Sequence, residues 1–157
     1  MWDIALSVHL ARDTLLSIVR HAPLTSIDLV LRDNTGAVLL GWRTNQPAKG
    51  TWFVPGGRVQ KGEHLDAAYV RIAQRETGLT LRREAAHFLG AYEHFYAENF
   101  AEISGLDTHY VVLAYQVDFE SAPNVIADDQ HDDLRWMPIS DALSSDDVHE
   151  NAKVYLR

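Results

Sequence analysis

Hydrophobic residues recur at helical spacing in four stretches of this 157-residue chain, and short apolar runs separate these stretches. The first predicted helix covers residues 13–21, and Pro23 stops its pattern. The second predicted helix covers Leu65–Thr77, and Gly78 directly after it is a suitable C-terminal stop. Two further short helices are predicted over residues 139–143 and 151–156.

Short apolar runs between the predicted helices indicate strands. Runs over residues 27–32 and Ala37–Arg43 flank a turn-forming tetrapeptide at residues 33–36, which predicts a β-hairpin. Further strands are predicted over residues 52–55, His87–Tyr96, 108–118 and 134–137. The polar segment 97–107 is expected to be a mobile loop. This order of elements predicts an α+β fold in which helices pack on a mixed sheet.

Composition and charge narrow the class of protein. The chain is 46% hydrophobic and 23% charged, without repeats or linkers, so we expect one domain over residues 1–157. Because it contains no cysteine, disulfides, thiolate metal sites and cysteine nucleophiles are excluded. A net charge of −8 argues against nucleic acid as a partner but leaves a small anionic ligand possible. No membrane span or signal core is recognisable, so a cytoplasmic protein is expected.

The stretch that carries candidate chemistry follows the predicted strand at residues 52–55 and begins with Gly56 and Gly57. Two glycines allow the backbone to come close to a ligand or ion, although a tight turn is the commoner meaning of such a pair. The residues that follow are spaced G-x5-E-x7-R-x4-E-x-G-L, and the fixed positions are Gly57, Glu63, Arg71, Glu76, Gly78 and Leu79.

This spacing resembles the Nudix box, G-x5-E-x7-R-E-U-x-E-E-x-G-U, where U is aliphatic. The resemblance implies a Nudix fold, an α/β/α sandwich with a mixed sheet flanked by helices and a loop–helix–loop box. The chain departs from the box at Ile72 and Arg75, where the family has glutamates, and at Ala73. Residues 72, 75 and 76 lie on one side of a helix. Of these three box positions, position 76 is the one that has a glutamate in this chain. In the ordinary box, that side presents several carboxylates to two or three divalent ions.

A closer resemblance, over about residues 23–151, is to the GDP-mannose mannosyl hydrolase branch of the Nudix family, which shares the truncated box. The segments that carry it are residues 44–50, 52–61, 94–96, 108–113 and 130–133. The resemblance implies hydrolysis of GDP-mannose and GDP-glucose to GDP and free sugar, with water attacking the anomeric carbon with inversion. It also implies a bound Mg²⁺, for which Mn²⁺ could substitute, and a homodimer. The weakly matching N-terminal helical segment, residues 1–22, could supply the dimer contact.

The same resemblance assigns the metal site and the scaffold of the box. It implies that the metal ligands are the Gly56 carbonyl, Glu76 and Gln130, an oxygen-only set that suits a hard cation. Glu63 and Arg71 would form an ion pair that holds the loop–helix–loop in shape.

The resemblance also assigns the reacting groups. It implies that His131, which titrates near neutrality, is the general base that takes a proton from the attacking water. The positions that match substrate-contacting residues are Arg43, Arg58 and Tyr110 at the diphosphate, and Asp28 and His94 near the sugar. Without the resemblance, the other side chains would also fit an ordinary surface or strand-core position, whereas Asp28 within an apolar strand is unusual because a buried carboxylate needs a partner.

Two other functions stay open at this point. An ordinary Nudix pyrophosphatase would cleave a P–O bond in a nucleoside diphosphate derivative, but the missing box glutamates count against it. A non-catalytic module that binds nucleotide sugars is the other alternative. The joint presence of Glu76, Gln130 and His131 counts against that alternative.

Overall fold

The computed structural model describes residues 10–127 and 131–157, and for residues 131 and 132 it describes the backbone alone. The helices are α1 (Arg12–His21), α2 (Leu65–Thr77), the 3₁₀ turn η1 (Arg83–Ala85), α3 (Ile139–Ser144) and α4 (Glu150–Lys153). The strands are β1 (Leu24–Asp33), β2 (Ala37–Arg43), β3 (Trp52–Phe53), β4 (Gly56–Arg58), β5 (His87–Tyr96), β6 (Thr108–Phe119) and β7 (His131–Pro138).

All seven strands form one mixed sheet, as the order of elements predicts. Its central path is β3-β2-β1-β6-β5, while β4 pairs with β1 and β7 pairs with β2. The long strands β1 and β6 run parallel along their full length, from Leu24 beside Tyr110 to Asp33 beside Phe119. The other edge of β1 is shared, because β2 pairs with it at Arg32 and β4 pairs with its first half.

The predicted hairpin between β1 and β2 is confirmed, and its turn is built by one side chain. The Asp33 carboxylate accepts hydrogen bonds from the backbone N–H groups of Thr35, at 2.9 Å, and of Ala37, at 3.0 Å. Gly36 adopts a φ of 83°, a conformation that a residue with a Cβ rarely takes. Local hydrogen bonding of this kind is the reason that Asp favours turns.

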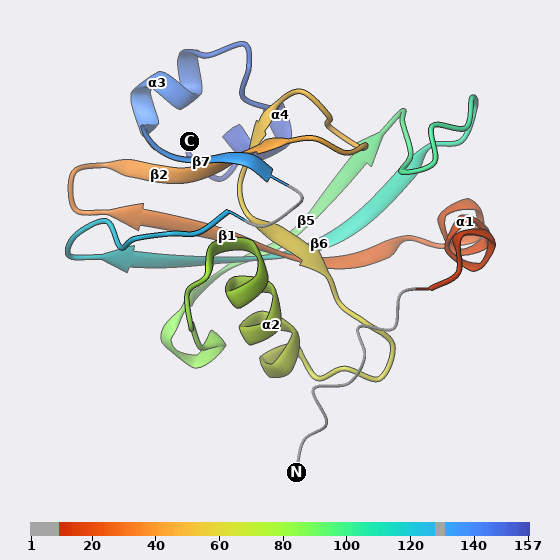
Figure 1. Cartoon of the computed structure of the whole chain (residues 1–157), viewed down its shortest axis with the longest axis horizontal. Coiled ribbons are helices and arrows are strands. Elements are labelled where there is room, and N and C mark those ends of the chain that lie inside the picture. The colour runs from red at the N-terminus through yellow and green to blue at the C-terminus, as the bar shows by residue number, and fades with distance from the viewer. Residues whose placement is uncertain (1–9, 128–130) are drawn as a thin grey trace.

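Alternate residues of β1 face two separate cores, which gives the sheet a helical layer on each side. Ile27, Leu29 and Leu31 are fully buried on the α2 side. Val30 is fully buried on the opposite side, in the core that α3 and α4 cover. Figure 1 shows α2 below the sheet and α3 and α4 above it. The expected α/β/α arrangement is therefore confirmed.

Helix α1 lies beside the sheet, and part of its apolar side packs within the chain. Val19 packs with Leu24 and Leu106, and three further apolar residues of the helix join this cluster: Leu15, Leu16 and Ile18. The dimer contact expected for this segment stays a prediction, since residues 1–9 lie outside the described part of the chain. No helix of the described residues is both long and apolar enough to cross a lipid bilayer.

Three predicted elements have wrong bounds, and the first predicted strand begins earlier than expected, at Leu24. The strand predicted over residues 52–55 ends at Phe53 as β3 on β2, and the chain then crosses to β1, where the unpredicted strand β4 forms. The strand predicted over residues 134–137 is longer and already pairs with β2 at His131. The helix predicted over residues 151–156 ends at Lys153, and the residues that follow form a turn.

Candidate functional site

A cleft with a volume of about 1190 Å³ opens between the sheet, α2 and α1. Seven of the nine residues expected to bind metal, bind substrate or act as the base line it, and they come from strands β1, β2, β4, β5 and β6 and from α2. These seven are Asp28, Arg43, Gly56, Arg58, Glu76, His94 and Tyr110. Residues that are up to 82 positions apart in sequence are thus brought together in one cavity, as the resemblance implies.

Two expected site residues are not described. Gln130, the third expected metal ligand, lies outside the described residues, and so does the side chain of His131. The backbone of His131 is described, and its Cα partner across the β2–β7 ladder is Arg43, which lines the cleft. The ladder shifts register between Gly41 and Arg43, so β7 carries an extra residue beside the cleft, a feature that is common next to active sites.

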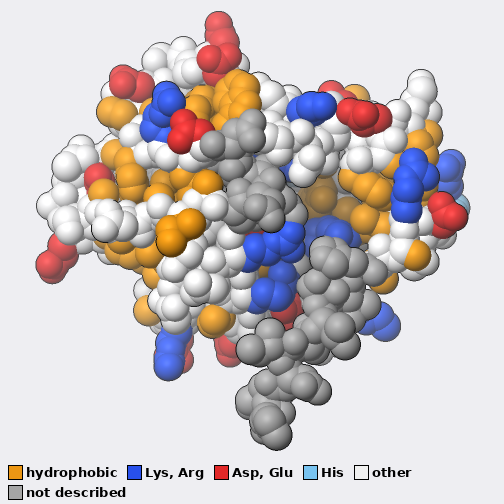
Figure 2. Space-filling model, viewed as in Figure 1, with side chains coloured by type: hydrophobic (Ala, Val, Ile, Leu, Met, Phe, Trp, Pro, Cys, Tyr) orange, Lys and Arg blue, Asp and Glu red, His pale blue; other side chains and the backbone are white. Residues whose placement is uncertain are grey.

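The cleft is locally basic in a chain whose net charge is −8. Among the described residues that line it, the cations are Arg43, Lys49, Arg58, Lys61, Arg71 and Arg75, and the acids are Asp28, Glu76 and Glu102. Figure 2 shows Lys and Arg side chains gathered in the middle of the visible face. A cleft lined mainly by one sign of charge attracts an oppositely charged ligand, so an anionic group is expected here.

Gly56 and Gly57 are part of strand β4 and do not form the tight turn that such a pair usually means. A Cβ on Gly56 would meet the backbone oxygen of Ile27 at 2.8 Å, and one on Gly57 would meet Cγ1 of Ile72 at 3.1 Å. The glycines therefore allow β4 to approach β1 and α2 closely. This close approach keeps the Gly56 backbone at the wall of the cleft.

Glu63 and Arg71 form the predicted ion pair. Arg71 donates two parallel hydrogen bonds to the carboxylate, at 2.7 and 2.9 Å, and a third, at 2.8 Å, to the carbonyl oxygen of Arg58. The backbone N–H of Gln60 also donates to Glu63, at 2.9 Å. Burial raises the pKa of Glu63, but these hydrogen bonds outweigh it, and the pKa lies below its ordinary value. The pair thus connects β4, the following loop and α2, which fixes the shape of the box.

The predicted side of α2 faces the cleft. Ile72, Arg75 and Glu76 all line it, and in the described part of the chain Glu76 is the one acidic residue that α2 contributes. Its side chain is 6% exposed, and its carboxylate lies 3.9 Å from the Nε atom of Arg75. Glu76 and the Gly56 backbone offer oxygen donors to the same cavity, which fits a hard divalent cation. Among the described residues no three acidic, His or Cys side chains are placed to hold one ion together, so a metal here would draw its further ligands from backbone, water, substrate or the undescribed residues.

Arg43, Arg58 and Tyr110 lie close enough to influence one another electrostatically. Burial raises the pKa of Tyr110, and the charges of Arg58 and Arg43 partly oppose this shift. The Nε–H group of Arg43 donates to the carbonyl oxygen of Pro47 at 2.8 Å, so the loop after β2 holds this guanidinium in place. Two arginines whose charges both act on the same phenol, all three lining the cleft, form a set of donors suited to a diphosphate.

Asp28 and His94 are buried in the wall of the cleft and share a partner that the sequence did not indicate. The hydroxyl of Tyr155 donates to Oδ2 of Asp28 at 2.7 Å and lies 3.1 Å from Nε2 of His94. Burial raises the pKa of Asp28 to about 7, although the bond from Tyr155 and the charge of Arg43 lower it. Burial lowers the pKa of His94 to about 4, and the charge of His149 adds to this. Tyr155 follows the last helix, and no motif or spacing in the sequence connects it to Asp28.

The cleft also has an apolar wall that sequence reasoning missed. Leu15 and Ile18 of α1 line it, and so does Phe100 from the loop between β5 and β6. Hydrogen bonds from Asn99 stabilise the conformation of this loop, because its side-chain amide donates to the carbonyl oxygens of Ile103 and Leu106 at 2.7 and 2.8 Å. The amphipathic pattern of α1 predicts that one side of the helix is apolar. It does not predict that this side borders the cleft.

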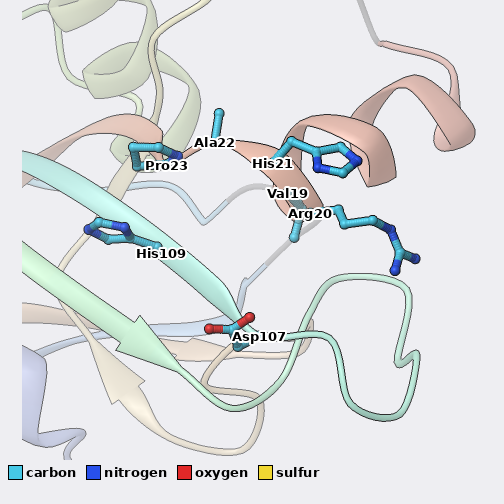
Figure 3. A pocket seen from close by; sticks show the side chains of 7 residues that line it. All are labelled: Val19, Arg20, His21, Ala22, Pro23, Asp107 and His109. Carbon is cyan, nitrogen blue, oxygen red and sulfur yellow. The ribbon is translucent and has the colours of Figure 1, made fainter.

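A second, smaller pocket of about 230 Å³ lies at the C-terminal end of α1. Figure 3 shows its lining, which includes His21, Asp107 and His109. None of its lining residues is among the described residues predicted to bind substrate or metal. The large cleft is therefore the candidate active site.

The fold and this cleft define the class of protein. The family model for the NUDIX domain matches residues 22–157, so the chain belongs to the Nudix family. It is accordingly a Nudix hydrolase, an enzyme class that acts on nucleoside diphosphate derivatives. Nudix hydrolases generally use divalent metal ions such as Mg²⁺ or Mn²⁺.

Several proteins are similar to this chain in sequence or in structure. The low-salt glycan biosynthesis protein Agl8 of Haloferax volcanii is 43% identical over 120 residues, which cover 76% of this chain and 73% of that protein. The MutT NUDIX hydrolase of Burkholderia pseudomallei has a TM-score of 0.68 at 24% identity, covering 85% of this chain and 95% of its own. The NUDIX domain of Shewanella oneidensis NrtR, solved with ADP ribose, has a TM-score of 0.66 at 21% identity, covering 94% and 95%. The two structures confirm the fold.

Proposed function

We propose that the protein hydrolyses GDP-mannose, and also GDP-glucose, to GDP and the free sugar, with water attacking the anomeric carbon with inversion. The observation that carries this proposal is the composition of the α2 side that lines the cleft. Glu76 lies there beside Ile72 and Arg75, where the ordinary box has further carboxylates. That set is too poor in carboxylates to hold the two or three ions that prepare a water for attack on phosphorus.

A single metal ion would stabilise the leaving diphosphate and would not have to activate the attacking water. In this proposal Glu76, the Gly56 carbonyl and Gln130 hold one Mg²⁺ or Mn²⁺, which when bound supplies charge stabilisation to the leaving diphosphate. Because such a leaving group needs no strong acid, the reaction does not require the facing pair of carboxylic acids found in most glycosidases.

The chain's own residues supply the remaining steps. Arg43 and Arg58 donate hydrogen bonds to the diphosphate and stabilise the charge that develops on it, and Tyr110 contacts the same group. Asp28 and His94 orient the sugar from the buried wall of the cleft. His131 accepts the proton of the attacking water, and the pairing of its backbone with Arg43 supports a location at this cavity.

The relatives support a role in sugar chemistry. Agl8, at 43% identity, is described as a glycan biosynthesis protein, and a hydrolase of nucleotide sugars would act on the donors that such chemistry uses. We propose in addition that the working form is a cytoplasmic homodimer, and light scattering at assay concentration measures its mass.

Hydrolysis of GDP-mannose in ¹⁸O-labelled water with Mg²⁺ tests the bond that is cleaved. Label in the free sugar, together with GDP as product, is the expected result. Label in a phosphate product with release of GMP would show P–O cleavage and would overturn the proposal in favour of a pyrophosphatase. Absence of turnover over a panel of nucleotide sugars would favour a binding module. Glu76→Gln is the matched variant, and we expect it to lose turnover while it keeps the carboxylate's shape.

A further inference from the structure

The hydroxyl of Tyr155 lies between the two buried polar residues of the cleft wall. It donates to Oδ2 of Asp28 at 2.7 Å and lies 3.1 Å from Nε2 of His94. Tyr155 is 4% exposed and is not among the described residues that line the cleft, whereas Asp28 and His94 both line it. The hydroxyl therefore acts from behind these two side chains.

The hydrogen bonds among Tyr155, Asp28 and His94 determine which of their atoms carry protons. A phenol carries one proton, and when Asp28 is ionised the Tyr155 hydroxyl uses that proton on the Asp28 carboxylate. Its oxygen can then only accept from His94, so Nε2 of His94 carries the ring proton. Nδ1 of His94 is left as an acceptor, and it faces the hydroxyl of Tyr96 at 3.4 Å. The low pKa of His94, about 4, agrees with a neutral ring in this tautomer.

Packing holds the Tyr155 ring in place. Its carbonyl oxygen accepts a hydrogen bond from Nη2 of Arg32 at 2.9 Å, which ties the C-terminal segment to β1. The ring of Tyr92 packs edge-on against it, with ring centroids 4.9 Å apart. Two independent contacts thus direct the hydroxyl at Asp28 and His94.

We propose that Tyr155 is a positioning residue of this active site. It holds the Asp28 carboxylate in one orientation and fixes the Nε2–H tautomer of His94, so that both groups are preorganised toward the sugar. This inference rests on the function proposed above, because it is the sugar end of that substrate that these two residues would orient.

Tyr155→Phe tests the proposal, because it removes the hydroxyl and keeps the ring. We expect kcat for GDP-mannose to fall roughly 10- to 100-fold while KM changes less than about 3-fold, since a misoriented group costs more in the transition state than in binding. The ¹⁵N NMR signals of His94 should show protonated Nε2 in the wild type and a mixture of tautomers in the variant. Tyr69→Phe is the matched control, because Tyr69 is also fully buried and its hydroxyl has no partner among the described residues. It should leave both measurements unchanged.

Two outcomes would overturn the proposal. One is a Tyr155→Phe variant with wild-type kcat and an unchanged His94 signal, and the other is a wild-type His94 that carries its proton on Nδ1. In the Asp28→Asn background we expect Tyr155→Phe to cost much less, since its partner is already altered; an undiminished cost would contradict action through Asp28. The NMR measurement needs no substrate, so it decides the role of Tyr155 even if GDP-mannose is not hydrolysed.

Discussion

His94 and Asp28 are buried ionisable residues of the cleft wall, and burial moves their pKa values in opposite directions. The pKa of His94 falls to about 4, so its ring is neutral at physiological pH. The pKa of Asp28 rises to about 7, with the bond from Tyr155 and the charge of Arg43 opposing the rise. Both side chains stay buried because Tyr155 satisfies their hydrogen bonds.

The pH dependence of stability provides a test of the His94 environment. Its pKa is lower in the folded state than the ordinary 6.5, so the unfolded chain binds the proton more readily. The contribution of His94 is therefore complete above pH 6.5 and is lost as pH falls toward 4, by up to about 3 kcal/mol. Because the raised pKa of Asp28 acts in the opposite direction over the same range, the loss is measured as a difference: in urea unfolding at a series of pH values, we expect the free energy of unfolding of the wild type to fall relative to that of His94→Gln as pH decreases from 6.5 to 4.

A control for the His94 experiment lies on the same strand. His87→Gln changes an exposed histidine of β5 and should leave the pH dependence as in the wild type. A His94→Gln variant with the wild-type slope would show that another group causes it. The nearest candidate is His149, whose pKa is also lowered by burial.

His131 is the residue that we expect to act as the general base. We expect His131→Gln to lower kcat for GDP-mannose roughly 10²- to 10⁴-fold with KM nearly unchanged, because a base acts on the chemical step. Steady-state kinetics and a binding titration with GDP separate the two effects. Near wild-type turnover in this variant would remove His131 from the mechanism.

At the scale of elements, the close approach of β4 to β1 and α2 is the feature that shapes the cleft wall. The carboxylate of Asp28 and the carbonyl oxygen of Ile27, both from the paired strand β1, occupy the space that a Cβ on Gly56 would need. The space beside Gly57 is limited by the Ile72 side chain. A side chain can shift by a few tenths of an ångström, but a paired strand cannot do so without losing its ladder.

Alanine substitutions at the two glycines should therefore differ in cost. We expect Gly56→Ala to lower the free energy of unfolding by about 3 kcal/mol, the upper end for overpacking, and Gly57→Ala by about 1 kcal/mol. Urea denaturation of the two variants, measured side by side, gives the comparison. Equal costs at both positions would mean that β1 does not limit the approach of β4.

Helices and strands whose own residues carry a clear apolar pattern were predictable, and segments that become strands only through pairing with distant residues were not. The helix Leu65–Thr77 and its Gly78 stop are confirmed, and Gly78 has the expected left-handed conformation with a φ of 74°. Strand β4 was missed because three residues with two glycines have no strand propensity, and only pairing with β1 makes them a strand. The pairing of β7 with β2 from His131 onward likewise depends on residues about ninety positions apart.

At the scale of the whole molecule, an acidic protein presents a basic cleft. The net charge is −8, yet the described lining contains twice as many cations as acids. Placement of charge, more than its total, thus makes the cleft suitable for an anionic diphosphate.

Ionic strength should reveal this local field. We expect the KM for GDP-mannose to rise several-fold between about 0.1 M and about 1 M salt, because the Debye length falls from about 10 Å to about 3 Å. The kcat should change less, since the bound diphosphate is shielded from solvent ions. Sucrose at equal osmolality is the control and should leave KM unchanged; a KM that does not respond to salt would contradict an electrostatic role for the cleft.

Which residues share a helix face follows from spacing along the chain alone, because helical periodicity is a local property. For this reason Ile72, Arg75 and Glu76 could be expected together, and all three line the cleft. Which side chains surround a buried carboxylate depends on how distant segments pack. Asp28 and Tyr155 are 127 positions apart, and only the packing of the C-terminal segment against β1 and β5 brings the hydroxyl to the carboxylate.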